Sequence, residues 1–275
     1  QIEVDPSKLL AYGVSMRRVV DAVRASNQDV GGRYVGSAAS NDTPEIFQEG
    51  IQFPCLKLLR GGERVPEVYR LIRANTRFPE TVLGDVEAQL AGCLMGRDLL
   101  VQLVEKYGVD VVSGAITSIW NHAEAAARAA VSSIPDGVYE AESFLDNDGI
   151  SMDRPINIPV RIEVSGEVMT IDLSNIADRV MGPYNSGRTG GGLTAAKVAF
   201  KYVTTGNDTV SEGSFRNLSV ILPDGKFLSA SPEAAKARYS TPLPTVVDTI
   251  IKADGSAADA KNTKTRDRDR CRGSD

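Results

Sequence analysis

The segment 182–192, GPYNSGRTGGG, is the local feature with the clearest chemical potential, and Thr194 follows it where a helix is predicted to begin. Glycines that open a helix offer free backbone N–H groups to an anion, and Arg188 adds positive charge. The segment lacks the lysine and the spacing of a P-loop. Two interpretations stay open, a tight turn that needs glycine or a substrate-binding loop formed by Asn185, Ser186, Arg188, Thr189, Gly190 and Gly191.

Cysteine chemistry has little support in this sequence. The three cysteines, Cys55, Cys93 and Cys271, are odd in number and widely spaced, and the single histidine is His122. A catalytic thiol needs a histidine or another cationic neighbour, and no spacing ties His122 to a cysteine. We therefore expect Cys93 to be a buried, inert thiol on the apolar face of a helix and His122 to lie on the surface.

The composition is typical of a globular protein. Of 275 residues, 42% are hydrophobic and 24% are charged, and the formal net charge is −5. This charge argues against a nucleic-acid partner, and the longest apolar stretches fall short of the ~20 residues of a membrane helix. The cysteine pattern fits a reducing compartment, so we expect a cytoplasmic protein. The chain begins with Gln1 rather than Met, so we interpret it as a fragment.

The pattern of apolar residues predicts an α+β fold. A long helix capped by Asp85 is predicted to end at Gly108, with a stripe of Leu90, Leu94, Val101 and Val104. A second helix follows, whose predicted buried side holds Val112, Ile116, Ile119, Ala123, Ala126 and Ala130. Because small residues let two helices approach closely, we expect an antiparallel helix pair, followed by a mostly antiparallel β-rich region.

Strands are predicted to dominate after residue 137. Residues 156–164 alternate strictly between apolar and polar positions, and a turn at residues 165–167 leads into a second strand at 168–173, which predicts a hairpin. A helix is predicted at 194–203, and a further hairpin is predicted from residues 218–222 and 226–229. Residues 253–275 hold no large apolar residue and mix opposite charges, which predicts a disordered tail.

Several stretches, in order along the chain, resemble the hydantoinase B/oxoprolinase family. The resemblance runs from about residue 36 to residue 252. The stretches are DTPEIFQEG at 42–50, RANTRFPE at 73–80, GDVEAQ at 84–89, IPDGVY at 134–139, GPYNSG at 182–187 and EGSFR at 212–216. The resemblance implies an ancestral hydrolase subunit that opens a cyclic amide (a hydantoin, 5-oxoproline or a lactam). It also implies a divalent metal, and an A-type partner subunit that uses ATP and Mg²⁺.

The resemblance also implies a metal motif that this chain has largely lost. Family members carry His-His-x-Asp-Val-Gly-Gly ahead of the EIFQEG stretch, and imidazoles with carboxylates suit a divalent metal. Here Ser26 and Asn27 replace the two histidines, and only Asp29 is retained. We therefore expect a chain that has lost its metal and is inactive alone. Glu45, Gln48 and Glu49 follow this motif closely; at helical spacing Glu45 and Glu49 would share a face as ligand or base, and the alternative is a solvated capping turn.

The first 36 residues resemble a different family, the periplasmic porter segment of resistance-nodulation-division efflux pumps. We interpret the chain as a fusion with its junction near residues 29–36, giving parts 1–36, 37–252 and 253–275. Sequencing of the encoding DNA across the junction would test this, because one reproducible reading frame is expected of a genuine fusion. Two alternatives to an enzyme subunit stay open: a non-catalytic fusion fragment or remnant, and an efflux-pump component.

Overall fold

The computed structural model describes residues 34–36, 43–53, 56–206 and 208–255, and they fall into two compact units. The first unit contains Gly50–Ile119 together with the residues up to Ala38, and the second contains Ala39–Glu49 and everything from Trp120 onward. No helix in the described ranges is long and apolar enough to cross a membrane.

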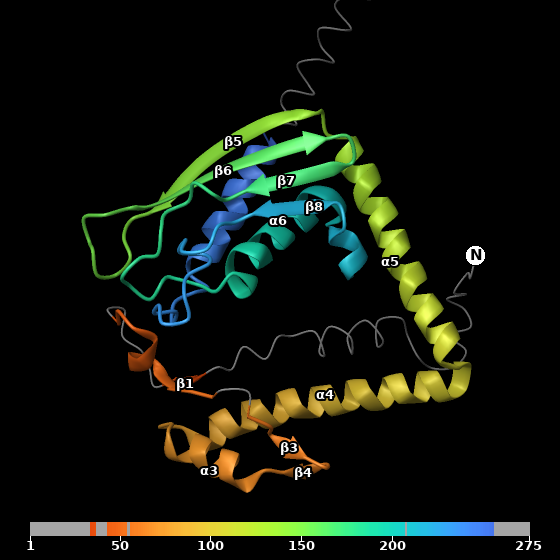
Figure 1. The fold of residues 1–275 in the computed structure, drawn as a ribbon, viewed down its shortest axis with the longest axis vertical. Coiled ribbons are helices and arrows are strands. Elements are labelled where there is room, and N and C mark those ends of the chain that lie inside the picture. Colours follow the sequence, from red (N-terminus) through yellow and green to blue (C-terminus); the bar gives the residue numbers. More distant parts are fainter. Residues whose placement is uncertain (1–33, 37–42, 54–55, 207, 256–275) are drawn as a thin grey trace, which may run out of the picture. The chain divides into compact units, whose positions relative to one another are not determined.

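The first unit is built around a pair of helices (Figure 1). Strands β1 (Tyr34–Gly36) and β2 (Gly50–Gln52) pair in antiparallel fashion, as do β3 (Leu59–Arg60) and β4 (Glu63–Arg64). Helices α3 (Pro66–Ala74) and α4 (Pro79–Tyr107) follow, each with proline in its first turn, where the missing N–H costs nothing. Val68, Ile72 and Leu83 form their small core. The Arg64 guanidinium also binds the Glu87 carboxylate at 2.8 and 2.5 Å, which ties β4 to α4.

Helix α4 differs from the prediction in three respects. It begins at Pro79 rather than at Asp85. Its predicted apolar stripe is partly on the surface, since Val101 and Val104 are 47% and 37% exposed. Cys93, expected to be buried, is also exposed. The apolar cluster that α3 shares with α4 lies at the first turns of α4, around Leu83, and farther along the helix Gly96 is buried.

Helix α5 (Val109–Ser132) passes from the first unit into the second. In the second unit its buried residues are Ala127 and Val131, one position away from the predicted Ala126 and Ala130. The 3-10 helix η3 (Glu212–Phe215) packs on it closely, because a Cβ on Gly213 would lie 1.9 Å from the Trp120 carbonyl oxygen. The sequence also predicts that α4 and α5 pack against each other as an antiparallel pair. Because α5 passes into the second unit, this packing depends on how the two units are placed, and it stays a prediction.

The second unit contains a four-stranded sheet in the order β5-β6-β7-β8 (Figure 1). Strands β5 (Gly137–Leu145), β6 (Ile156–Ser165) and β7 (Val168–Asp172) are antiparallel neighbours, which confirms the α+β class and the first hairpin. Strand β8 (Leu218–Ile221) pairs in parallel with β7. The predicted second hairpin is therefore wrong. In its place, Lys226 forms an isolated bridge with Asp178.

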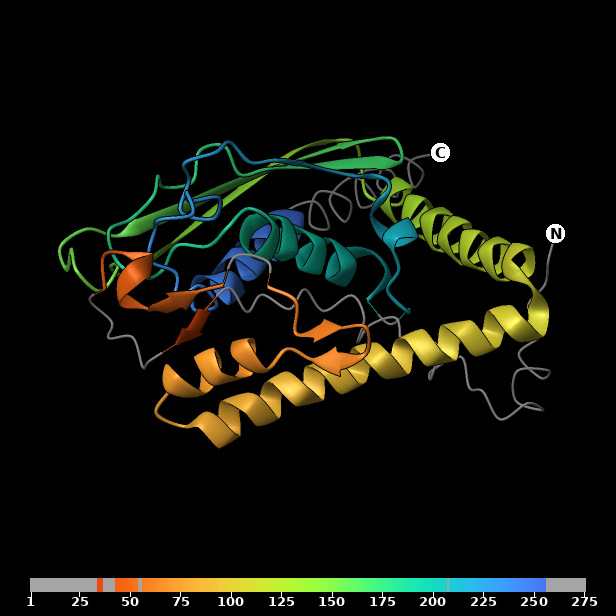
Figure 2. The same cartoon turned by 60° about the horizontal axis from the view of Figure 1, so that its bottom comes forward.

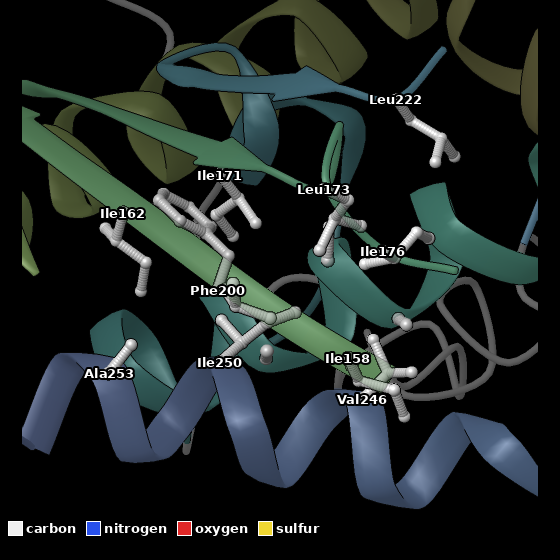
Figure 3. Close-up of a cluster of buried hydrophobic side chains, with 14 of the residues drawn as sticks. Ile158, Ile162, Ile171, Leu173, Ile176, Phe200, Leu222, Val246, Ile250 and Ala253 are labelled. Carbon is white, nitrogen blue, oxygen red and sulfur yellow. The ribbon is translucent and has the colours of Figure 1, made fainter. Parts of the chain in front are cut away.

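The core of this unit lies between the sheet and two helices (Figures 2 and 3). Every second residue of β6 is buried, which confirms the alternation predicted for 156–164. Helix α6 (Thr194–Thr205) and a helix over residues 242–255 contribute Phe200, Val246 and Ile250 to the same cluster. Ala253 is also buried there. The helix continues to residue 255, which is past the predicted start of the tail at residue 253. The rest of that tail lies outside the described residues.

Candidate functional site

The glycine-rich segment forms a turn of π-helix, η2 (Thr189–Leu193), directly ahead of α6. Arg188, Thr189 and Gly190 are exposed. The N–H groups of the last three residues of η2 donate to backbone carbonyls, Gly191 to Gly187 at 2.8 Å, Gly192 to Leu228 at 3.2 Å and Leu193 to Arg188 at 3.1 Å. These N–H groups are therefore not open to an anion, and an anionic ligand would meet the exposed start of the turn.

Close packing explains three of the glycines in this segment, Gly182, Gly191 and Gly192, and leaves Gly187 and Gly190 unexplained. A Cβ on Gly191 would lie 1.8 Å from the Ser186 Oγ, so no other residue fits without rearrangement. A Cβ on Gly190 would meet no atom within 4 Å. The buried Ser186 Oγ has no hydrogen-bond partner among the described residues. The open space at Gly190 is thus on the surface side of the turn, and Ser186 lies beneath it.

The Arg188 side chain is held at the end of β8. Its Nη1 donates to the Leu222 carbonyl oxygen and to the Asp224 Oδ1, the latter at 3.3 Å. The side chain remains 45% exposed. Arg188 therefore presents a positive charge to solvent in a defined orientation, although part of its hydrogen-bonding capacity is already used.

Asn185 is completely buried and organises the loop around it. Its Oδ1 accepts a hydrogen bond from the Val180 N–H at 2.9 Å. Its Nδ2 lies within 2.9 to 3.1 Å of three carbonyl oxygens, those of Val180, Gly182 and Ala235. Both polar atoms of this buried amide already form hydrogen bonds with backbone groups, so neither is available to bind a substrate. Asn185 is therefore a support for the predicted loop.

Asp148 is a part of the site that the sequence reasoning missed. Its Oδ1 accepts the N–H groups of Ile150 and Ser151, and its Oδ2 accepts those of Met181 and Gly182, all at 2.6 to 3.0 Å. Burial raises the pKa of Asp148, but the four backbone N–H donors outweigh burial and leave the pKa below its ordinary value. The Asp-Asn-Asp-Gly run at 146–149 is typical of such a turn, but its distant partner at 181–182 could not be read from it.

Glu49 is also buried, and it does not share a face with Glu45. Glu49 follows η1 (Ile46–Gln48), a turn of three residues that leaves Glu45 and Gln48 exposed. Its Oε1 accepts the N–H groups of Lys236 at 2.6 Å and Ala237 at 2.7 Å. Burial raises the pKa of Glu49 above its ordinary value, against the opposing effect of these two donors and of the Lys236 charge. The helical pair of carboxylates, one of the two alternatives, is therefore wrong, and the solvated turn does not describe the buried Glu49 either.

Residues 230–238 connect the two predicted parts of the site. On one side this segment donates to Glu49, and its Glu233 carbonyl accepts the Ile46 N–H at 3.1 Å. On the other side its Ala235 carbonyl accepts Asn185, and the Ala230 N–H donates to the Ser186 carbonyl at 2.9 Å. We call the four segments 43–49, 146–151, 181–193 and 230–238 the loop assembly. All four belong to the second unit.

The described residues do not fit a metal site. No group of three or more His, Cys, Asp or Glu side chains comes together as a metal would require within the described ranges. Asp29, the retained residue of the predicted metal motif, lies outside them. Lone carboxylates such as Glu49 cannot complete a coordination sphere. The loop assembly as described therefore supplies hydrogen-bond donors and two exposed arginines, Arg188 and Arg238.

Comparison with known proteins shows the family to which the chain belongs. A model of the Hydantoinase B/oxoprolinase family matches residues 17–266. The chain belongs to this family. The match begins inside the segment predicted to be efflux-pump-like and extends into the predicted tail. The comparisons give the efflux-pump part of the prediction no support.

Relatives within the family are much longer than this chain. The caprolactamase subunit beta of Pseudomonas jessenii is 30% identical over 239 residues, which cover 86% of this chain and 40% of the relative. The crystal structure of the ATP-dependent caprolactamase from the same organism is similar with a TM-score of 0.70 and 27% identity, over 82% of this chain and 39% of that one. The nucleotide-free structure of acetone carboxylase shares the fold, with a TM-score of 0.66 at 14% identity over 77% of this chain and 30% of that one.

Proposed function

We propose that this chain is part of a B-type subunit of an ATP-dependent hydrolase that opens a cyclic amide. The observation that carries the proposal is the family match over residues 17–266, which includes every segment of the loop assembly. The similar caprolactamase is named as an ATP-dependent enzyme, and the matching relative is its beta subunit. In the proposed complex an A-type subunit uses ATP and Mg²⁺ to activate the ring, and the B-type subunit completes its opening.

The exposed start of the η2 turn is the proposed substrate-facing surface. Arg188, Thr189 and Gly190 lie at the surface, while Asn185, Ser186 and Gly191 are buried beneath them. A fixed guanidinium with an adjacent helix start suits an anionic group, such as the charge that develops on a carbonyl oxygen during ring opening. Glu45 and Gln48 are exposed on segment 43–49, which residues 230–238 link to Asn185, and we propose that they belong to the same surface. The buried Glu49 holds that segment in place.

The proposal includes inactivity of this chain when it is alone. Ser26 and Asn27 occupy the positions where the resembling motif has histidines, so Asp29 is left without the imidazoles that would accompany it. Without these ligands the chain cannot hold the divalent metal that polarises a carbonyl. A double substitution, Ser26→His with Asn27→His, is expected to restore stoichiometric metal binding.

The test measures ring opening and metal content together. The purified chain would be incubated with ATP, Mg²⁺ and hydantoin, 5-oxoproline or caprolactam, with and without an A-type subunit, and the ring-opened product would be quantified. We expect no product from the chain alone. Metal analysis should find metal in the double-histidine variant and none in the variant that also carries Asp29→Asn. ATP-dependent product from the unmodified chain alone would contradict the proposal of inactivity.

A further inference from the structure

The turn after β8 places a carboxylate directly against Arg188. The Asp224 Oδ1 lies 3.3 Å from the Arg188 Nη1, and within the described ranges neither side chain has another ion pair. The same Nη1 donates to the Leu222 carbonyl oxygen just beyond the strand. The Asp224 side chain is 92% exposed, so packing of the core does not require it. The guanidinium therefore faces the proposed substrate surface with a carboxylate already beside it.

The backbone holds Asp224 in this position. The next residue, Gly225, has a φ of +85°, in the left-handed region that favours glycine. Its N–H donates to the Ser229 carbonyl oxygen at 3.2 Å, and its own carbonyl oxygen accepts the Arg179 N–H at 2.8 Å. On the other side of Asp224, the Pro223 carbonyl oxygen accepts a hydrogen bond from the Ser229 Oγ. Both neighbours of Asp224 are thus fixed, so the position of its carboxylate does not depend on an exposed ion pair, which is weak by itself.

Beside this ion pair, the start of the η2 turn offers hydrogen-bond donors that have no acceptor. No hydrogen bond within the described ranges occupies the backbone N–H groups of Arg188, Thr189 and Gly190. The buried Ser186 Oγ beneath them also has no partner there, and it is directed at Gly191 of the same turn. Unpaired N–H groups suit the carbonyl oxygen of an amide, which accepts hydrogen bonds although the ring carries no charge. These donors therefore do not require a substrate with a negative group.

We propose that Asp224 is a specificity-determining residue, which makes the proposed substrate surface select an uncharged ring over a ring that carries a carboxylate. This inference rests on the proposed function, because that proposal places the substrate at Arg188, Thr189 and Gly190. A carboxylate on the ring would compete with Asp224 for the guanidinium and would be repelled by it. At a separation of about 4 Å in water, this repulsion corresponds to about five-fold weaker binding. An uncharged ring uses the free N–H groups and meets no such repulsion, so the selectivity comes from the repulsive group.

Two rings that differ only in a carboxylate test this selectivity. The ring of 5-oxoproline without its carboxylate is 2-pyrrolidinone, and binding of each compound to the full chain would be measured by NMR titration of the amide signals of residues 188–190. We expect the unmodified chain to bind 2-pyrrolidinone at least as tightly as 5-oxoproline. Asp224→Asn should raise the affinity for 5-oxoproline by about five-fold and should leave the affinity for 2-pyrrolidinone nearly unchanged. Unchanged amide positions in β5–β7 would show that the variant is folded.

The matched control is Asp178→Asn, which removes the same charge from another exposed carboxylate of the second unit. The Asp178 side chain is 83% exposed and its Oδ1 lies 2.7 Å from the Lys226 Nζ, so this variant should bind both rings as the unmodified chain does. An equal gain for 5-oxoproline in the two variants, or tighter binding of 5-oxoproline than of 2-pyrrolidinone by the unmodified chain, would overturn the inference alone, because the rings would still bind at residues 188–190. No shift of these signals with either ring, in any of the three proteins, would contradict the proposed substrate surface and the inference together.

Discussion

At the scale of residues, the Glu49 carboxylate joins two segments that are far apart in sequence. It accepts two backbone N–H groups from residues 236 and 237, while its Oε2 is buried without a hydrogen-bond partner in the described structure. A buried donor left without an acceptor costs about 1–3 kcal/mol. The acceptor at Glu49 therefore matters more to stability than its charge.

Substitution of Glu49 should separate these two contributions. Glu49→Ala leaves two N–H groups unpaired and is expected to lower the free energy of unfolding by about 2–4 kcal/mol, whereas Glu49→Gln keeps an acceptor oxygen and should cost about 1 kcal/mol. Urea denaturation followed by the fluorescence of Trp120, the single tryptophan, would measure both. The exposed Glu45→Gln is the control and should stay within about 0.5 kcal/mol of the unmodified chain. Equal losses at Glu45 and Glu49 would contradict this account.

Asp254 should make stability depend on pH. Burial raises its pKa from 3.8 to about 6, and its Oδ1 has no hydrogen-bond partner within the described ranges. Because the folded pKa lies above the unfolded one, the contribution to stability is complete below the unfolded pKa and is lost as pH rises through about 6. Asp254→Asn should therefore have a higher Tm than the unmodified chain at pH 7.5, and the difference should vanish near pH 4.

Thermal melts of both proteins between pH 4 and pH 8 would check this expectation. The exposed Asp153→Asn serves as the control, and it should follow the unmodified chain across the range. A Tm difference for Asp254→Asn that does not change with pH would mean that the carboxyl group is not the cause.

At the scale of elements, the η2 turn distinguishes two adjacent glycines. Gly191→Ala would place a Cβ 1.8 Å from the Ser186 Oγ, while Gly190→Ala meets nothing within 4 Å. We expect Gly191→Ala to destabilise the second unit by about 1–3 kcal/mol, as overpacking does. Gly190→Ala should be neutral or slightly stabilising, by up to about 1 kcal/mol. Denaturation curves of the two variants form a matched pair, and similar losses in both would show that the turn conformation, rather than the packing, requires glycine.

The sequence predicted the positions of the strands in the second unit better than it predicted which strands pair with each other. Alternation in residues 156–164 identified β6, because one face of that strand is buried and the other is not. The same reasoning assigned residues 218–222 to a hairpin, although β8 pairs with β7 from a distant part of the chain. Local spacing carries no information about a partner about 45 residues away. For the same reason the contacts of Asp148 with residues 181–182 could not be predicted.

In the predicted site, too, the local conformation could be predicted from the sequence and the long-range contacts could not. The segment 182–192 was correctly recognised as a glycine-rich turn that opens a helix. The sequence could not show that Asn185 faces three carbonyl groups or that Glu49 is buried. The N–H groups that bind Glu49 and one of the three carbonyl groups around Asn185 belong to residues 230–238, which no motif had marked. The polar residue types were visible in the sequence, but their burial depends on the folded chain.

At the scale of the whole molecule, apolar side chains are exposed over the last turns of α4 and the first turns of α5. Met95, Val101, Val109 and Val111 are 64%, 47%, 60% and 48% exposed. An apolar surface of this kind promotes association. The chain also spans only about 40% of the length of its curated relatives.

We therefore expect charged substitutions on this surface to reduce aggregation. Met95→Glu with Val101→Glu should raise the concentration at which light scattering shows association by several-fold. The control Gln89→Glu with Gln102→Glu adds the same charge at exposed polar positions of α4. An equal improvement in both variants would assign the effect to net charge rather than to the apolar surface.

The parallel pairing of β7 with β8 has a consequence for how the molecule folds. The chain between Asp172 and Leu218 contains the η2 turn and α6, so the last strand can join the sheet only after this long connection has closed. Contacts of high sequence separation form slowly, because the entropy of closing the loop is lost before the contacts stabilise it. Completion of the sheet and ordering of the η2 turn are thus expected to be one kinetic event, and a refolding chain acquires its proposed substrate-facing surface late.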